Sequence, residues 1–281
     1  MSNEPLVSIC MPAYNHEDYV ECALDSVLSD DYFNKEIVIV NDGSTDSTHD
    51  VISGWIKKNK DAINVRYISR PNKGICRTLN ELVDKAEGEY VVLLASDDYL
   101  LDKSIEVRLA YLKQHTDKLA VIGDAVVVND NNAVLFDSAL HGLYKVNTKK
   151  YLNDSSLKRQ IITNWAVPGP VLMVKKEIYT LLGKYDERLK VEDWDFYLRM
   201  VSKNLLGYVP NKVSAYRVHE FNLSRRKGVA CGMYIQMLKI AAYNFKNFSL
   251  GSKLLLSLVT AKNIISLIAN MMLLRCVKKN K

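Results

Sequence analysis

Three acidic segments of this chain have the residue types and positions needed for chemistry on a bound ligand. They contain these carboxylates: Asp42, the adjacent pair Asp97 and Asp98, and the adjacent pair Glu192 and Asp193. The first two segments directly follow apolar, β-branched runs at residues 36–40 and 90–94, which are typical of buried strands. Because open α/β sheets bind ligands at the carboxyl ends of their strands, we expect one site in which carboxylates hydrogen-bond a nucleoside, hold a metal and take a proton.

The pair Asp97 and Asp98 predicts a metal site. Adjacent carboxylates repel each other unless a cation neutralises them. Oxygen ligands of this kind suit Mg²⁺ or Mn²⁺, which often bridge to substrate phosphates. The alternative is an exposed loop whose acids cap the helix that begins near Lys103.

The segment at residues 41–46 predicts a tight turn followed by a helix. Gly43 allows the turn, and either Ser44 or Asp46 can cap the helix. Asp42, directly after the strand, then faces the ligand and can accept a hydrogen bond from a base N–H.

Strands alternate with helices through the first part of the chain, which predicts βαβ units. The expected strands span residues 6–11, 36–40, 64–68 and 90–94, and the expected helices span residues 17–29, 46–58, 75–86 and 103–114. Pro12 is expected to stop the first strand. Later strands at 119–129, 133–137, 171–174 and 213–218, with helices at 175–182 and 194–203, predict a mixed second half that is irregular at 140–165. The expected fold class is α/β, with a mainly parallel, Rossmann-like sheet and C-terminal helices.

The composition is that of a soluble globular protein. The 281 residues suffice for one large domain, with 48% apolar residues, 25% charged residues and a formal net charge of +6. The five cysteines are odd in number and lack Cys-x-x-Cys spacing, which argues against a disulfide framework and a cysteine zinc site. Cys10, inside an apolar run, is expected to be buried. No secretory signal is visible at the start, so we expect a cytoplasmic protein.

The segment at residues 254–274 has a broad apolar face and a narrow polar stripe. Its length fits a membrane span, but Lys262 near its centre costs about 2.5–3.5 kcal/mol on insertion scales. A helix lying in the membrane interface, followed by the basic tail at residues 275–281, fits better. The alternatives are a helix packed on its own domain or in a homodimer interface. We expect the basic tail to meet lipid and not nucleic acid.

The common glycine-rich nucleotide motifs are missing from the sequence. It has no Gly-x-x-x-x-Gly-Lys-Ser/Thr and no Gly-x-Gly-x-x-Gly at a strand–helix junction, and it lacks a Gly-x-Ser-x-Gly elbow. A P-loop ATPase and a classical dinucleotide enzyme are therefore disfavoured. A nucleotide bound without such a loop needs a cation for its diphosphate, which Asp97 and Asp98 could hold.

Taken in order, the short motifs of this chain resemble those of the family 2 glycosyltransferases. The matching pieces lie at residues 12–15, 40–46, 72–74 with Asn80, 86–90, 95–98, 183–186, 192–195 and 216–219. Each piece is weak alone, but their order over residues 6–225 is specific. The resemblance implies the A-type glycosyltransferase fold, inversion at the anomeric carbon, a nucleotide-diphosphate-sugar donor and a divalent metal, Mn²⁺ or Mg²⁺.

The resemblance also implies roles on the donor side. The implied nucleotide-binding residues are Pro12, Ala13, Tyr14, Asn15, Asp42, Asn72, Lys73 and Asp97. Among these, Asp42 would bind the base N–H, most often of uracil, and Asp97 would lie near the ribose. Asp98 would ligate the metal, with His219 as a further metal or diphosphate contact or, alternatively, a surface histidine.

On the acceptor side, Asp193 would be the general base that removes a proton from the acceptor hydroxyl, with Glu192 in support. Trp165 is a candidate for stacking on a sugar, whereas Trp194 is expected in the core. The loop at residues 225–227 could close over phosphate or be solvated.

The chain departs from the family pattern at two positions. Asn41 stands where the family usually has Asp, and Ala95 stands where many members have another Asp. Each departure removes one charge from a donor-side loop. The acids to which the resemblance assigns roles are present, so we expect an active enzyme with a UDP-sugar as donor.

We expect a catalytic domain at residues 1–225, with a nucleotide-binding half to about 118 and an acceptor half after it, and a C-terminal helical segment at 226–281. The expected acceptor is a saccharide on a lipid diphosphate, in surface-polysaccharide (O-antigen or capsule) synthesis at the inner face of the cytoplasmic membrane. One alternative is a sugar-nucleotide nucleotidyltransferase, although residues 12–15 replace its glycine- and arginine-rich loop. The other is a non-catalytic polysaccharide-binding or scaffold protein of the same fold.

Overall fold

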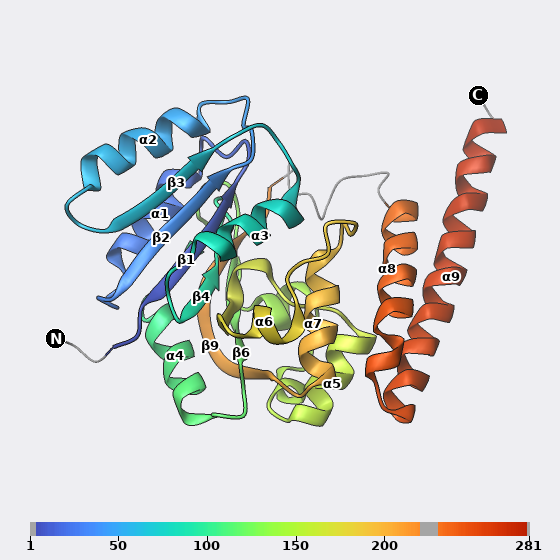
Figure 1. Cartoon of the computed structure of the whole chain (residues 1–281). Coiled ribbons are helices and arrows are strands. Elements are labelled where there is room, and N and C mark those ends of the chain that lie inside the picture. Colours follow the sequence, from blue (N-terminus) through green and yellow to red (C-terminus); the bar gives the residue numbers. More distant parts are fainter. Residues whose placement is uncertain (1–3, 220–229, 280–281) are drawn as a thin grey trace.

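In residues 4–219 and 230–279, which the computed structural model describes, the strands form one nine-stranded sheet (Figure 1). Its order is β3-β2-β1-β4-β8-β6-β9-β5, with β7 paired to β6. The strands are β1 (Val7–Ala13), β2 (Lys35–Asn41), β3 (Asn64–Ser69), β4 (Tyr90–Leu93), β5 (Tyr99–Leu100), β6 (Ala120–Val128), β7 (Val134–Phe136), β8 (Leu172–Lys175) and β9 (Leu206–Arg217). Strands β1 to β4 pair in parallel, whereas β8 runs antiparallel to β4 and β6. The predicted parallel first half and mixed second half are confirmed.

Helices follow the strands through the first half and gather at the end of the chain. They are α1 (Val20–Ser29), α2 (Thr48–Asn59), α3 (Ile75–Lys85), α4 (Ser104–Gln114), α5 (Asp154–Thr163), α6 (Ile178–Leu182), α7 (Glu192–Ser202), α8 (Ala230–Asn244) and α9 (Leu250–Lys279). The region predicted to be irregular, residues 140–165, contains short helical turns at Ala139–Leu143 and Thr148–Tyr151 and the regular helix α5, and a further turn lies at Gly169–Val171. Helix α3 packs on β1 and β2, and its beginning lies beside the proposed site.

Strand β1 continues through Pro12 to Ala13, so the expectation that Pro12 stops the strand is wrong. Strand β4 pairs with β1 only as far as Leu93 opposite Cys10, so the missing N–H of Pro12 breaks no bond of that ladder. The Pro12 carbonyl still accepts a hydrogen bond from the Ser96 amide (3.3 Å). The extension carries β1 to the edge where the acidic loops lie.

Strand β9 begins at Leu206, earlier than predicted. The first part of this strand was not predicted because it contains Pro210, and a proline within a run argues against a strand. In the structure the pairing of β9 with β6 skips from Tyr208 to Lys212, which places Pro210 in a bulge. The loss of its N–H therefore costs no ladder bond.

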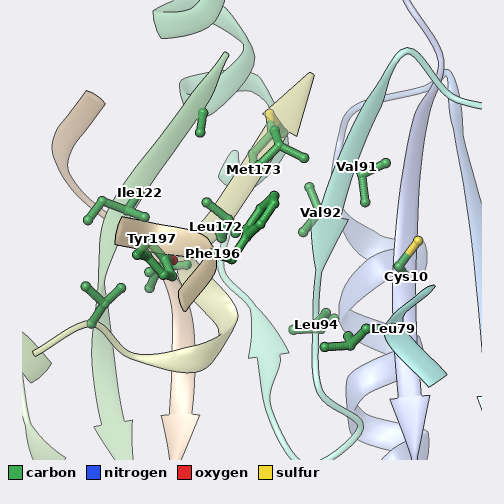
Figure 2. Close-up of a cluster of buried hydrophobic side chains, with 14 of the residues drawn as sticks. Cys10, Leu79, Val91, Val92, Leu94, Ile122, Leu172, Met173, Phe196 and Tyr197 are labelled. Atoms are coloured by element: carbon green, nitrogen blue, oxygen red, sulfur yellow. The ribbon is translucent and has the colours of Figure 1, made fainter. Parts of the chain in front are cut away.

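The core between the sheet and α7 fixes the position of that helix. Figure 2 shows Ile122 of β6 and Leu172 of β8 beside Phe196 and Tyr197 of α7, all of them buried. Cys10 lies in the same cluster, and its expected burial is confirmed. Helix α7 starts earlier than predicted, so the third acidic segment forms its first turn.

Helices α8 and α9 pack against each other and against α7 and α5 (Figure 1). Helix α9 buries Leu256 and Asn263 but leaves Leu254, Leu258 and Ile265 exposed. Part of its polar stripe therefore faces the protein, while part of its apolar face lies outside. By length and composition alone the stretch Leu250–Ile268 could cross a membrane, a test that many buried helices also pass.

Candidate active site

The loops that follow β1, β2 and β4 are hydrogen-bonded to one another at one edge of the sheet. The Ala13 carbonyl accepts from the Asp42 amide (2.9 Å), and the Pro12 carbonyl accepts from the Ser96 amide (3.3 Å). These contacts bring the first and second acidic segments together. The edge is formed by the carboxyl ends of parallel strands, where sheets of this kind bind ligands.

Residues 14–16, after β1, are bonded to the turn after β2. The Asn15 amide donates to Ser44 Oγ (3.0 Å), and Asn15 Oδ1 accepts from the Thr45 amide (2.8 Å). Asn15 has a φ of 54°, in the left-handed region that asparagine tolerates. Tyr14 is 41% exposed, so its ring is open to a ligand.

The turn at Gly43 brings two loops into close contact. Its φ is 76°, and a Cβ atom there would lie 2.5 Å from the Asn72 amide nitrogen, so a larger residue would separate the loops. Asp46 Oδ1 accepts from the Thr48 amide (3.0 Å) at the first residue of α2. Of the two residues predicted to cap this helix, Asp46 thus accepts from its first amide, although the N-cap position itself is occupied by Ser47.

The Asp42 carboxylate is buried and bonded to three groups of the chain. Oδ1 accepts from the Lys73 amide (2.8 Å) and is paired with Arg70, and Oδ2 accepts from the Gly74 amide (3.0 Å). The side chains of Asn72 and Lys73 are exposed, so Lys73 meets Asp42 through its backbone. A carboxylate has about four acceptor positions, so these bonds leave room for one more donor.

His16, Asp97 and His219 form a cluster whose possible ligand atoms lie within 4.8 Å of one another. His219 Nε2 is 3.1 Å from Asp97 Oδ2, and His16 Nε2 is 3.7 Å from the same oxygen. His16 Nδ1 lies 2.8 Å from Ser96 Oγ, which orients the ring. Burial lowers the pKa of His16, so its imidazole is neutral at pH 7. Two imidazoles and a carboxylate are a donor set that fits a divalent cation.

Arg217 is buried against the turn that holds Asp97 and Asp98. Its Nε donates to the Asp97 carbonyl (2.8 Å), and its amide donates to Asp98 Oδ1 (2.8 Å). Its guanidinium lies 4.9 Å from the centroid of the Tyr19 ring and 5.7 Å from that of Tyr99. One arginine of β9 thus fixes the turn after β4 from both backbone and side chain.

The two carboxyls of this turn differ in pKa. Burial and the charge of Asp97 raise the pKa of Asp98 well above its ordinary value. Burial also acts to raise the pKa of Asp97, but its hydrogen bond with His219 and the nearby His16 outweigh burial and lower the pKa. A bound cation would remove the repulsion between the two acids, so the pair fits the predicted metal.

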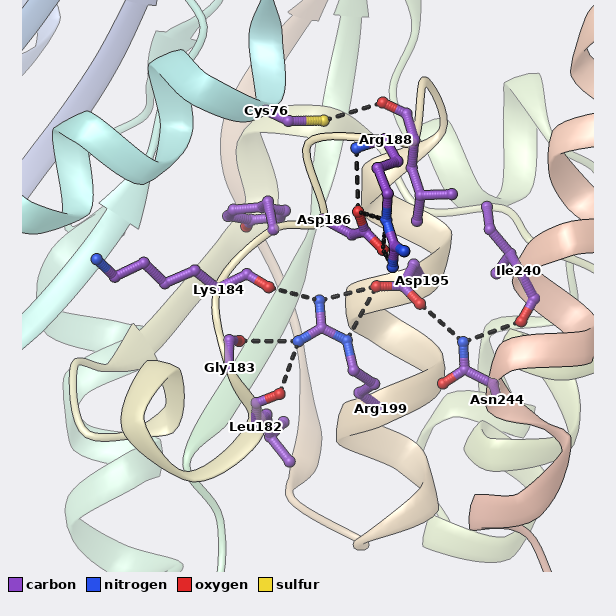
Figure 3. Close-up of polar contacts among 12 residues, drawn as sticks. Cys76, Leu182, Gly183, Lys184, Asp186, Arg188, Asp195, Arg199, Ile240 and Asn244 are labelled. Atoms are coloured by element: carbon purple, nitrogen blue, oxygen red, sulfur yellow. Dashed lines mark hydrogen bonds and ion pairs between the residues drawn. The ribbon is translucent and has the colours of Figure 1, made fainter.

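Glu192 and Asp193, in the first turn of α7, lie near Cys76 of α3. The Cys76 thiol donates to the Leu189 carbonyl (3.1 Å), which joins the loop before α7 to α3 (Figure 3). Burial raises the pKa of the Cys76 thiol, with the nearby carboxyls of Glu192 and Asp193 as lesser causes. Because Asp42 holds the turn just before α3, the start of this helix joins the acid after β2 to the acids of α7.

The pair on α7 has pKa values suited to proton transfer. Burial raises the pKa of Glu192 to about 8, with the charge of Asp193 as the second cause, and burial raises that of Asp193 to about 6. No described residue donates a hydrogen bond to the Asp193 carboxyl. By surface area Asp193 is an exposed residue, so water and an acceptor hydroxyl can reach it. A carboxyl with a pKa near the working pH can take a proton and release it again.

The two tryptophans of the second half occupy different positions. Trp165 is half-buried, and its ring lies 4.6 Å from that of Tyr197. Trp194 is fully buried and donates through Nε1 to the Ile161 carbonyl (2.9 Å), so its expected core role is confirmed. The loop at residues 225–227 lies outside the described residues.

Three residues of the site were not predicted: His16, Arg70 and Arg217. His16 directly follows the motif at residues 12–15, and Arg217 lies in the motif at 216–219, so adjacency to a motif was the available signal. Arg70 has no such signal, because its pairing with Asp42 exists only once the turn is folded. His219, which was expected as a further metal or diphosphate contact, lies 3.1 Å from Asp97.

Residues 8–168, more than half of the chain, match the sequence profile named Glycosyl transferase family 2. The chain belongs to glycosyl transferase family 2. This confirms the family inferred from the order of the motifs. The matched region contains the acids after β2 and β4 and ends before α7.

Relatives of this family 2 glycosyltransferase include proteins of polysaccharide synthesis. A chondroitin synthase of Pasteurella multocida is 29% identical over 255 residues, which are 87% of this chain and 25% of that protein. TuaG of Bacillus subtilis, a proposed teichuronic acid biosynthesis glycosyltransferase, is 28% identical over 225 residues, or 80% of this chain and 83% of TuaG. An uncharacterized glycosyltransferase of Rickettsia typhi is 28% identical over 219 residues, and the match covers 77% of this chain and 65% of that protein. The chain thus spans only part of several relatives.

Solved structures share the fold. S. aureus TarS in complex with UDP-GlcNAc superposes with a TM-score of 0.68 at 20% identity, covering 91% of this chain and 71% of that one. Mannosyltransferase PcManGT of Pyrobaculum calidifontis, in complex with GDP-Man and Mn²⁺, has a TM-score of 0.70 at 17% identity, covering 95% and 74%. The protein has the predicted A-type glycosyltransferase fold.

Proposed function

We propose that this family 2 glycosyltransferase inverts the anomeric carbon as it moves a sugar from a nucleotide-diphosphate sugar to a saccharide hydroxyl. The proposal rests on two unlike acid sites in one fold. The acids after β2 and β4 are bonded to the chain, whereas Asp193 has a pKa of about 6 and no donor among the described residues. Bonded carboxylates suit a binding role, and an unbonded carboxyl suits proton transfer.

The donor we propose is a UDP-sugar. Asp42 has an acceptor position left for the N–H of a uracil, and the exposed ring of Tyr14 would lie along the base. The backbone of Pro12 and Ala13 joins these loops, and Asp97 would meet the ribose. UDP-GlcNAc and GDP-Man in the similar structures support a nucleotide sugar as donor in general. The choice of uracil as the nucleobase rests on the resemblance of the motifs.

The residues that would hold a divalent cation are His219, Asp97 and His16, whose possible ligand atoms lie within 4.8 Å of one another. The family resemblance adds Asp98, the neighbour of Asp97 in the same turn. When bound, Mn²⁺ or Mg²⁺ neutralises the charge that develops on the departing diphosphate. Arg217 keeps the turn of Asp97 and Asp98 in place, and the neutral ring of His16 leaves a nitrogen lone pair for the cation.

Asp193 is the proposed general base. It takes the proton of the acceptor hydroxyl while that oxygen attacks the anomeric carbon on the face opposite the diphosphate. The sugar carries positive, oxocarbenium-like charge in the transition state. Glu192, with a pKa of about 8, stays protonated at pH 7, so it adds no second negative charge beside the base. Trp165 would line the acceptor, with part of its ring still accessible.

The acceptor we propose is a saccharide on a lipid diphosphate, used in surface-polysaccharide synthesis at the inner face of the cytoplasmic membrane. The similarity to TuaG and to a chondroitin synthase supports polysaccharide synthesis. The exposed Leu254, Leu258 and Ile265 of α9 support contact with lipid. In this view residues 1–225 form the catalytic domain, divided near residue 118, and residues 226–281 the membrane-facing segment.

A donor screen followed by product analysis tests the function. Thermal unfolding is measured against UDP-, GDP- and dTDP-sugars with Mn²⁺, because a ligand that binds only the folded state raises the unfolding temperature. The donor found is then incubated with saccharide acceptors. Release of UDP together with a glycosylated acceptor is expected. In a parallel incubation with a nucleoside triphosphate and a sugar 1-phosphate, formation of a nucleotide sugar with release of pyrophosphate would instead establish a nucleotidyltransferase. Donor binding without either reaction would mean a non-catalytic protein.

The membrane contact has its own test. We expect the triple variant Leu254→Glu, Leu258→Glu, Ile265→Glu to lose sedimentation with vesicles that contain anionic lipid. Phe33→Glu is the matched control, because Phe33 is 91% exposed but lies outside α9. Equal sedimentation of the triple variant and the unaltered protein would overturn lipid contact through this face.

A further inference from the structure

The last residues of α8 contact the chain on both sides of Glu192 and Asp193. Asn244 Nδ2 donates to Asp195 Oδ1 (2.8 Å), two residues after Asp193 (Figure 3). Tyr243, the neighbour of Asn244, lies under Arg188, whose guanidinium is 5.6 Å from the centroid of the ring. Arg188 belongs to the loop that enters α7.

Asp195 is the centre of this contact. Its Oδ2 is 2.9 Å from Nε and 2.8 Å from a terminal nitrogen of Arg199, one turn further along α7. Arg199 in turn donates to the carbonyls of Leu182 (2.9 Å), Gly183 (2.8 Å) and Lys184 (3.1 Å), which end α6 and begin the loop toward α7 (Figure 3). The network therefore joins three elements: α8, α7 and the loop before α7.

The contact between Asn244 and Asp195 is shielded from water. Asn244 is 1% exposed and Asp195 6%. Asn244 Nδ2 also donates to the Ile240 carbonyl of its own helix (3.0 Å), which holds the amide in one orientation. A buried carboxylate that loses a partner is costly to keep, so the bond constrains where α7 can lie relative to α8.

We propose that the C-terminal helices position the general base, with Asn244 and Tyr243 as positioning residues that act on Asp193 through Asp195 and Arg188. The inference rests on the proposed role of Asp193. Helix α8 fixes α7 just after the base, and Tyr243 fixes the loop just before it. A shift of the helix by a fraction of an ångström changes the approach of Asp193 to the acceptor hydroxyl, to which proton transfer is sensitive.

The test measures kcat and the KM for the donor in full-length variants. We expect Asn244→Ala and Tyr243→Ala to lower kcat roughly tenfold while the donor KM stays within about a factor of two. Tyr243→Phe keeps the ring under Arg188 and should restore kcat. Because Tyr243 is 47% exposed, its variants remain folded even where Asn244→Ala lowers stability.

Two controls lie in α9 and in the turn that follows α8, outside the contacts of Tyr243 and Asn244 with α7 and its loop. Asn263→Ala removes another buried asparagine, on α9, and Phe245→Ala removes a ring of the same helix end, beneath Lys253. Both should keep kcat. Loss of kcat in the controls to the same extent would mean that the helices act only through general stability, and would overturn the proposal.

A double variant separates this proposal from the proposed function. In the Asp193→Asn background, Asn244→Ala should cause no further loss, because both changes act on the same step. If Asp193→Asn is itself fully active, the proposed base is wrong. If Asp193→Asn is inactive while Asn244→Ala and Tyr243→Ala keep full kcat, the base stands and the positioning role is overturned.

Discussion

Asp42 and Asp193 are both acids of the proposed site, yet the chain holds them in opposite ways. Asp42 is buried and accepts from two backbone amides and Arg70. Asp193 has no donor among the described residues, and burial raises its pKa to about 6. The first arrangement fixes a carboxylate through its hydrogen bonds, and the second leaves a carboxyl able to change its protonation.

The difference shows where stability and reactivity are separated in this fold. Asp42 stabilises the folded state through its hydrogen bonds, because removing its carboxylate would leave buried donors without an acceptor. Asp193 contributes little to the stability of the folded state, because no hydrogen-bond donor among the described residues compensates its charge. Substitution of Asp193 should therefore lower activity more than stability, whereas substitution of Asp42 should have a marked effect on stability.

The largest expected effect is on turnover at Asp193. Asp193→Asn keeps the size of the side chain but cannot take a proton at neutral pH, so kcat should fall by about 10²- to 10⁴-fold. Donor affinity should change by less than a factor of about two, because Asp193 is not among the proposed donor contacts. Turnover is measured by release of nucleoside diphosphate, and affinity by calorimetry.

Glu187→Gln serves as the control for Asp193→Asn. Glu187 lies in the loop before α7 but is exposed and paired with Arg77 (2.7 Å). Its replacement should leave turnover unchanged. A fully active Asp193→Asn would remove the contrast between the two acids.

The next effect concerns the cation. His219→Ala and His16→Ala should each weaken Mn²⁺ binding by about 10- to 100-fold. Binding is measured in the absence of donor from the electron paramagnetic resonance signal of free Mn²⁺. His49→Ala is the control, because its ring stacks on Tyr67 outside the cluster. Loss at His219 alone would mean that the cation uses Asp98 and His219 without His16.

Asp42 should show the reverse of Asp193. Asp42→Asn replaces acceptors with an amide group that faces the donors of Lys73, Gly74 and Arg70, so the free energy of unfolding should fall by about 1–3 kcal/mol. UDP affinity should fall while pyrophosphate affinity does not, if Asp42 meets the base. Chemical denaturation and calorimetry measure the two effects. Equal losses for both ligands would restrict Asp42 to holding the turn.

Much of the site follows from local sequence patterns. An acid directly after an apolar run must lie at a strand end, which is how Asp42, Asp97 and Asp98 were predicted. Asp193 was implied by the family resemblance, and the structure then placed it at the start of a helix. Local patterns succeed here because a strand fixes the position of the residue that follows it.

The partners of these acids could not be predicted in the same way. Arg217 reaches the Asp97 carbonyl across 120 positions of sequence, and Asn244 reaches Asp195 across 49. The periodicity of the sequence cannot predict such long-range contacts, because they depend on how β9 and α8 pack. The position of Pro12 could not be predicted for the same reason. Whether a proline costs a ladder hydrogen bond depends on where the neighbouring strand β4 ends.

The smallest expected effect is the pH dependence contributed by Glu192. Its folded pKa of about 8 lies above the ordinary value of 4.5, so the folded state binds the proton more tightly than the unfolded chain does. The resulting stabilisation is complete below about pH 4.5 and is lost as the pH rises through about 8. Since Glu192 is partly solvent-exposed, the loss is on the order of 1 kcal/mol.

Glu192→Gln should remove this dependence, because glutamine does not titrate. Denaturation curves at pH 5 and pH 8 should show the unaltered protein losing more stability than the variant over that interval, while Glu187→Gln behaves as the unaltered protein. Asp193 then retains its own titration near pH 6, so kcat/KM of Glu192→Gln should still fall below that pH. Identical pH dependence of stability in the variant and the unaltered protein would show that Glu192 is ionised in the folded state, and that Asp193 works beside a second negative charge.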